Sequence, residues 1–140
     1  MDKQILRQSA AGLGIATMLF GVTPLLLPDR FARVFGFETP DAATASMMRS
    51  LGVRDIVMGM GLWSAAAHGG NFAPWLLART LTDGGDTLAV GIAAARGKRD
   101  WRFLALGALA LGAMLGDALL YREAKRTATQ TKQAKQVEQG

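Results

Sequence analysis

Cysteine is absent from the 140 residues, and His68 is the only histidine. The lack of cysteine excludes disulfides, thiolate metal sites and thiol catalysis. A single histidine excludes a metal site built from several imidazoles, and we expect neither a metal nor a cofactor. Charged residues are also few, at 19% of the chain, whereas hydrophobic residues make up 50%. The charge collects at the chain ends, in two connections and in two short stretches inside apolar segments.

The formal net charge of +5 raises the question of a nucleic-acid partner. The basic residues, however, flank apolar segments or lie in the C-terminal tail, and aromatic side chains do not alternate with them. Basic residues beside a membrane span more often contact anionic lipid headgroups. We therefore expect membrane lipids as partners and no nucleic acid.

Four apolar segments are long enough to cross a bilayer as helices. The first, residues 9–27, carries no charge and has about the ~20 residues that a span requires. We expect it to be a retained helix, although a basic start followed by an apolar core also fits a signal peptide. The remaining helices are expected at residues 41–67, 73–95 and 101–121.

The connection over residues 28–40 places several phenylalanines among Arg30 and Arg33. This pattern fits a short amphipathic segment at the membrane interface, or equally a loop whose aromatic side chains pack on the bundle. Thr39 followed by Pro40 predicts the N-cap and first position of the next helix.

The predicted fold is therefore all-α: a four-helix transmembrane bundle with a short interfacial segment between its first and second helices. Residues 1–121 form a four-span membrane domain, and residues 122–140 form a basic, partly disordered tail. The protein is expected to be multi-pass in the cell (inner) membrane. Basic residues are almost evenly divided between the two sides, so the positive-inside rule favours cytoplasmic termini only slightly.

Ionisable side chains interrupt the apolar segments and form the candidate ligand site or buried polar network. These residues are Arg49, Arg54, Asp55, Arg79, Asp83, Asp86 and Asp117. At ~2.5–3.5 kcal/mol for each exposed central charge, seven of them would cost roughly 17–25 kcal/mol. We therefore expect them to pair, to reach water or to be neutral, and residues of this kind often mark a working site.

Depth in the bilayer predicts which of these residues meet. Antiparallel third and fourth helices would place Arg79 and Asp117 about 6–8 Å inside the same boundary, at ~1.5 Å rise per residue. Asp83 follows Arg79 by one helical turn, so it competes with Asp117 for the Arg79 side chain. The seven residues comprise three arginines and four aspartates, so one carboxylate is expected to stay protonated. Asp83 or Asp55 is the expected protonated residue, because these two are the most central in the bilayer.

Several functions are compatible with such a network. Its salt bridges could fix helix register in a structural protein, or form a site for a small ligand or lipid. The alternatives are a membrane enzyme acting on a small lipophilic substrate and a small proton-coupled transporter. A cavity reaching Arg54 and Asp83 would favour these alternatives, whereas a dry, paired core would favour the structural role. Ala108, Gly112 and Gly116 form a small-residue ridge, a candidate surface for a homo-oligomer.

The stretch Arg49-Ser-Leu-Gly-Val-Arg54-Asp55, followed by Gly59 and Gly61, resembles the R-x-x-G-x-R-D segment of an uncharacterised family of small four-helix integral membrane proteins. The resemblance spans roughly residues 10–121, and the chain is also loosely similar to DoxX-like membrane proteins. It implies a compact four-span bundle with Arg54 and Asp55 inside. It implies no particular activity.

Overall fold

The computed structural model describes residues 2–138, and helices account for most of that range. Its elements are α1 (Lys3–Leu26), α2 (Pro28–Val34), α3 (Ala42–Ala67), α4 (Ala73–Ala95) and α5 (Trp101–Glu138). The predicted all-α class is confirmed. In the described part of the chain, two segments are long and apolar enough to cross a membrane: α1 and the Trp101–Gln130 part of α5.

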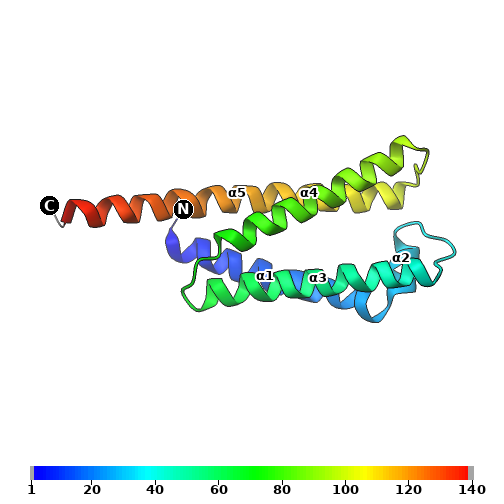
Figure 1. Ribbon diagram of the computed structural model, residues 1–140, viewed down its shortest axis with the longest axis horizontal. Helices are drawn as coiled ribbons and strands as arrows, with labels where there is room; N and C mark the ends of the chain where they lie inside the picture. Colours follow the sequence, from blue (N-terminus) through cyan, green and yellow to red (C-terminus); the bar gives the residue numbers. More distant parts are fainter. Residues whose placement is uncertain (1, 139–140) are drawn as a thin grey trace.

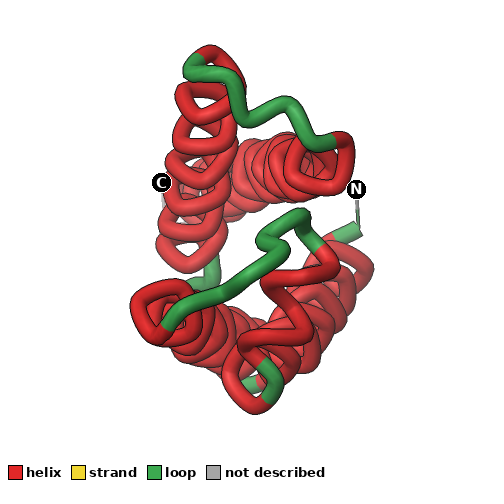
Figure 2. Tube along the Cα trace, turned by 90° about the vertical axis from the view of Figure 1, so that its right-hand side faces the viewer, coloured by secondary structure: helices red, strands yellow, loops and turns green. Residues whose placement is uncertain are grey.

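The long helices form two antiparallel pairs that lie side by side (Figure 1). α1 packs along α3, and α4 packs along α5, whereas contacts between the two pairs are far fewer. Viewed along the bundle, the pairs stand as two separate layers (Figure 2). The few contacts between the α1–α3 pair and the α4–α5 pair therefore determine how the two pairs are arranged relative to each other.

Glycines bring the backbones of α1 and α3 close together. Gly14 and Gly21 on α1 face Gly59 and Gly52 on α3. A Cβ atom added at Gly14 would lie 2.7 Å from the carbonyl oxygen of Gly59, and one added at Gly52 would lie 2.5 Å from that of Gly21. On each helix the two glycines are two turns apart and share one face. This face has no room for larger side chains, as is typical of closely packed membrane helices.

An apolar cluster joins the two pairs at the end of the bundle that holds the N-terminus. All four long helices, with the residue before α4, contribute to it: Leu6, Ala10, Leu62, Ala66, Phe72, Leu76 and Ala124. The polar residues described below lie further along the helices from this cluster. The apolar cluster therefore closes one end of the space between the pairs.

The connection after α1 contains a helix, α2, which the sequence pattern did not predict as such. Phe31 and Ala32 are buried and pack with Met48 of α3. Arg30 and Arg33 are exposed on the opposite side. α2 is therefore amphipathic, with its apolar face on the bundle.

The predicted cap of α3 at Thr39 is wrong, because Asp41 caps this helix. One carboxylate oxygen of Asp41 accepts hydrogen bonds from the backbone N–H of Thr44 at 2.8 Å and from its hydroxyl at 2.7 Å. These hydrogen bonds favour the ionised carboxylate and lower the pKa of Asp41. The negative charge also lies at the positive end of the helix dipole.

The last helix does not end near Tyr121, as the sequence suggests, but continues to Glu138. Residues 122–138 contain neither glycine nor proline and are rich in Ala, Lys, Arg and Gln, which are good helix formers. A helix already nucleated in the bundle extends through such residues at little cost. Residues 139–140 of the expected tail lie outside the described part of the chain.

Candidate functional site

Arg79 of α4 is at the centre of the first polar cluster, which we call the Arg79 cluster: Arg79, Asp83, Asp117 and Thr17. Its Nε donates to Asp117 Oδ2 at 3.0 Å, and its Nη1 donates to Thr17 Oγ1 at 2.6 Å. Asp83 Oδ2 is 3.9 Å from Arg79 Nη2, beyond hydrogen-bond distance. Arg79 is 7% exposed and Asp117 only 1%. This guanidinium therefore joins α4 to both α5 and α1.

Arg54 of α3 is at the centre of the second polar cluster, the Arg54 cluster: Arg54, Asp55 and Asp86. Arg54 forms a two-pronged contact with Asp86 of α4, Nη1 to Oδ1 at 3.0 Å and Nη2 to Oδ2 at 2.8 Å. Its Nε and Nη2 also contact Asp55 Oδ1 at 3.0 and 2.9 Å. Parallel N–H···O contacts of this kind are geometrically specific for arginine and a carboxylate. Arg54 thus joins α3 to α4.

Together the two clusters connect the helix pairs where apolar contacts between them are few. Arg79 reaches Thr17 across the gap between α4 and α1, while Arg54 reaches Asp86 between α3 and α4. The apolar cluster containing Leu76 closes one end of this region. The pairing of Arg79 with Asp117, expected from depth, is present, and the competing Asp83 contact is longer.

The structure gathers six of the seven predicted residues and leaves out Arg49. That side chain is exposed on α3, and we find no ion pair or side-chain hydrogen bond for it within residues 2–138. The sequence already indicates that Arg49, Arg54 and Asp55 cannot all share one face of a helix. The excess of carboxylates is therefore larger than the sequence count suggests, because two arginines meet four aspartates.

Two carboxylate oxygens in the Arg79 cluster have no hydrogen-bond partner. Asp117 Oδ1 and Asp83 Oδ2 are both inaccessible to solvent and receive no donor from the described residues. Both carboxyl groups lie beside the same guanidinium, with Asp83 Oδ2 3.9 Å from Arg79 Nη2 and Asp117 Oδ2 3.0 Å from Arg79 Nε. A buried acceptor without a donor costs about 1–3 kcal/mol, so the lack of a donor to these two oxygens needs a physical explanation.

Thr17 is a member of the site that the sequence does not indicate. It accepts from Arg79 and donates its own hydroxyl hydrogen to the carbonyl oxygen of Leu13 at 2.8 Å. Ser9 and Thr23 lie in the same charge-free run, so a hydroxyl alone does not distinguish Thr17. Only the packing of α4 against α1 selects it.

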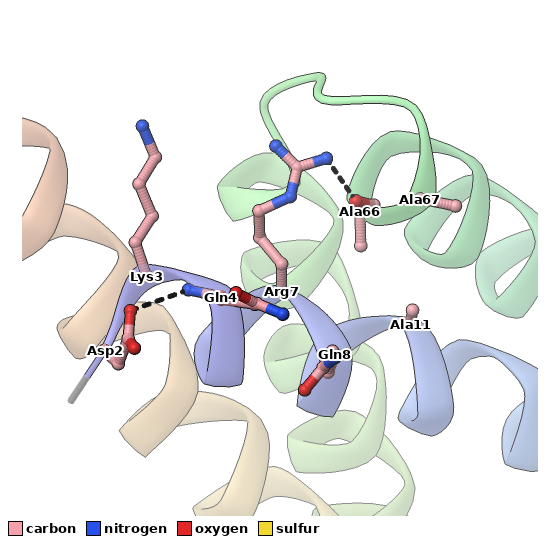
Figure 3. Close-up of a pocket in the computed structure, with 8 residues that line it drawn as sticks. All are labelled: Asp2, Lys3, Gln4, Arg7, Gln8, Ala11, Ala66 and Ala67. Atoms are coloured by element: carbon pink, nitrogen blue, oxygen red, sulfur yellow. Dashed lines mark hydrogen bonds between the residues drawn. The ribbon is translucent and has the colours of Figure 1, made fainter.

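Two surface hollows lie away from these clusters. One, of about 480 Å³, is at the N-terminal end, where Arg7 donates to the carbonyl oxygen of Ala66 at 2.5 Å (Figure 3). The other, of about 490 Å³, lies between α2 and the start of α5. Its lining combines apolar and basic side chains: Arg33, Val34, Phe35, Trp101, Arg102 and Ala105. None of the seven residues of the candidate site lines either hollow.

The small-residue ridge on α5 is on the outside of the molecule. Ala108, Gly112 and Gly116 are all exposed, and nothing lies within 4 Å of a Cβ atom added at either glycine. The ridge therefore takes no part in the α4–α5 contact.

The fold is an all-α arrangement of two helix pairs, with two helices apolar enough to cross a membrane. The polar links between the pairs are the Arg79–Thr17 hydrogen bond and the partly buried Arg54–Asp86 contact. Residues 14–134 match a family described as a domain of unknown function (DUF4267), and the chain belongs to that family. This confirms membership of an uncharacterised family, while the R-x-x-G-x-R-D motif and the DoxX-like similarity stay predictions. Neither a curated protein nor a solved structure matches the chain.

Proposed function

We propose that this protein is a multi-pass integral membrane protein in which α3 and α4 cross the bilayer together with α1 and α5. Its network of arginine, aspartate and threonine side chains would hold the two helix pairs in one arrangement through the Arg79–Thr17 and Arg54–Asp86 contacts. On this proposal the network has a structural role, and the outer surface binds lipid. The cell (inner) membrane remains the proposed location.

The observation that carries this proposal is the reversed distribution of polarity. Large apolar side chains are exposed on all four long helices, for example Leu19, Val57, Leu81 and Leu109. Apart from the exposed Arg49, the charged side chains in the middle of α3, α4 and α5 instead turn toward each other. Water would favour the opposite arrangement, whereas hydrocarbon favours this one.

Helix length also supports four spans. α3 has 26 residues and α4 has 23. At ~1.5 Å rise per residue these lengths are about 39 and 35 Å, compared with roughly 30 Å of bilayer hydrocarbon. Polar residues within a span are tolerated when they face the bundle interior and pair there. The basic hollow containing Arg33 and Arg102 would then lie at a bilayer surface, where anionic headgroups are available.

The absence of cysteine makes the proposed topology directly testable. Single cysteines introduced at the exposed positions Glu38, Asn71 and Arg99 would each be a unique reporter for a membrane-impermeant maleimide. We expect cysteines at positions 38 and 99 to react from one side of the membrane, and a cysteine at position 71 to react from the other. With the N-terminus in the cytoplasm, position 71 would be cytoplasmic.

The alternative with only α1 and α5 as spans gives a different result, because positions 38, 71 and 99 would all react from the same side. That outcome would exclude four spans. A cysteine at Val57, exposed in the middle of α3, provides the matched control. We expect it to react only after the protein is denatured.

We also propose that the ridge Ala108, Gly112 and Gly116 packs against a second copy of the chain. Exposed leucines flank the ridge, among them Leu111 and Leu115. Small residues at every fourth position let membrane helices approach closely, and the leucines on either side then pack against the partner.

Replacing Gly112 by isoleucine is expected to abolish this oligomer by blocking the close approach. Gly91→Ile is the control, since Gly91 is also exposed with nothing within 4 Å of an added Cβ, but it lies on α4. Light scattering in detergent, corrected for bound detergent, should give an oligomer for the wild type and Gly91→Ile and a monomer for Gly112→Ile. A monomeric wild type, or an unaffected Gly112→Ile, would contradict the proposal.

A further inference from the structure

The Arg79 cluster carries one more negative charge than it can balance if all its groups are ionised. Arg79 supplies one positive charge, while Asp83 and Asp117 would supply two negative charges. Asp117 is 1% exposed, so water cannot solvate the excess charge there. Two carboxylates beside one arginine do not both ionise readily, because each disfavours the charge on the other.

The hydrogen bonds of the Arg79 cluster show which carboxylate oxygens lack a donor. Arg79 satisfies Asp117 Oδ2, but the buried Asp117 Oδ1 and Asp83 Oδ2 receive no donor. A single proton between these carboxyl groups would turn one oxygen into a donor and leave the other as its acceptor. One proton would thus provide a hydrogen bond between the two oxygens and balance the charge of the cluster.

No neighbouring side chain in the described structure can replace that proton. Thr17 of α1 already uses its hydroxyl hydrogen on the carbonyl oxygen of Leu13. Arg54 of α3 directs its guanidinium to Asp55 and Asp86. Asp55 of α3 and Asp86 of α4 are carboxylates and can only add negative charge.

We propose that Asp83 and Asp117 form a proton-binding site that holds one shared proton at the contact between α4 and α5. Proton uptake converts one carboxylate to a carboxylic acid, which donates to the other. Release of the proton leaves two adjacent carboxylates and weakens the contact between α4 and α5. The site does not depend on membrane insertion, because protein atoms alone bury Asp117.

Infrared spectroscopy of the purified full chain tests the proposal, since a carboxylic acid has a C=O stretching band that a carboxylate lacks. Labelling aspartate with ¹³C at the side-chain carboxyl separates this band from glutamate signals. We expect one protonated aspartate in the wild type at neutral pH. The band should disappear in both Asp83→Asn and Asp117→Asn, because the proton belongs to the pair.

Asp86→Asn is the matched control, because Asp86 is also on α4 but is held by Arg54. We expect the band to persist in this variant. A wild type in which every aspartate is ionised at neutral pH would overturn the proposal. It would equally be overturned if the band survived in Asp83→Asn and Asp117→Asn.

The pH dependence of stability gives a second readout. The folded chain would hold one proton that its unfolded aspartates release, so stability should fall as pH rises above the range in which free aspartates titrate. The folding equilibrium constant is expected to decrease by up to about tenfold per pH unit while the pair retains its proton. In Asp83→Asn, whose amide N–H₂ can donate to Asp117, this dependence should be absent. An identical pH dependence in both proteins would contradict a shared proton.

Discussion

Replacement of Arg79 by methionine is expected to lower the free energy of unfolding by about 3–5 kcal/mol, the usual cost of removing one partner from a buried ion pair. Arg79 is the contact that satisfies Asp117 Oδ2, and Asp117 is 1% exposed. The variant would leave this carboxylate without its hydrogen-bond donor and would remove the link from α4 to Thr17. Equilibrium unfolding in mixed detergent micelles measures the loss.

A double variant separates loss of the pair from loss of packing. Arg79→Met combined with Asp117→Leu removes both partners and replaces them with apolar side chains. Such replacements are often neutral or stabilising, so we expect the double variant to recover at least half of the loss. If it is no more stable than Arg79→Met alone, an unpaired carboxylate is not the cause.

Arg49→Met is the control for the loss of an arginine. Arg49 is exposed, and no partner for it occurs among the residues that the structure describes. A change within about 0.5 kcal/mol is expected, as for most surface substitutions. Equal losses in Arg49→Met and Arg79→Met would mean that overall charge, and not the buried contact, controls stability.

Gly14→Ala is expected to destabilise the protein by about 1–3 kcal/mol, the range for inserting a methyl group into a well-packed contact. Its Cβ would lie 2.6 Å from the backbone nitrogen of Trp63 and 2.7 Å from the carbonyl oxygen of Gly59. Both atoms belong to the backbone of α3, so no side-chain rotation can relieve the overlap. α1 and α3 would have to move apart along their shared face.

Gly12→Ala provides a closely matched control on the same helix. Gly12 is exposed, and nothing lies within 4 Å of an added Cβ. Alanine is a better helix former by about 1 kcal/mol, so this variant should be unchanged or slightly more stable. The same unfolding measurement compares the two variants. Similar behaviour of Gly12→Ala and Gly14→Ala would contradict the close packing of α1 on α3.

Local sequence patterns located the four long helices, although α1 begins at Lys3 and not at the expected residue 9. α4 occupies the expected residues 73–95, and α5 begins at the expected Trp101. Apolar runs interrupted by glycine, proline and charge determine such boundaries within a few residues along the chain. The cap at Asp41 and the extension of α5 to Glu138 were missed, because side-chain hydrogen bonding and continued helix propensity outweighed the weaker signals nearby.

Depth along the helices predicted the Arg79–Asp117 pair, but the other partners were determined only by the tertiary structure. Arg54 and Arg49 lie in one motif, yet Arg54 contacts Asp86 while Arg49 is exposed. Likewise Gly14 packs against α3, while Gly12 of the same helix packs against nothing within 4 Å. Both outcomes depend on how each helix is rotated about its axis and on which helix lies beside it.

The sequence by itself determined that the chain forms long apolar helices and that arginines and aspartates inside them must find partners. The physical reason is local: each segment carries its own hydrophobicity and its own cost of burying charge. The tertiary structure decided which carboxylate Arg54 reaches on α4, that Thr17 takes part, and that Asp83 and Asp117 each keep a buried oxygen without a donor beside Arg79. These contacts join residues that are far apart in the chain, and their geometry exists only after the two helix pairs have packed together.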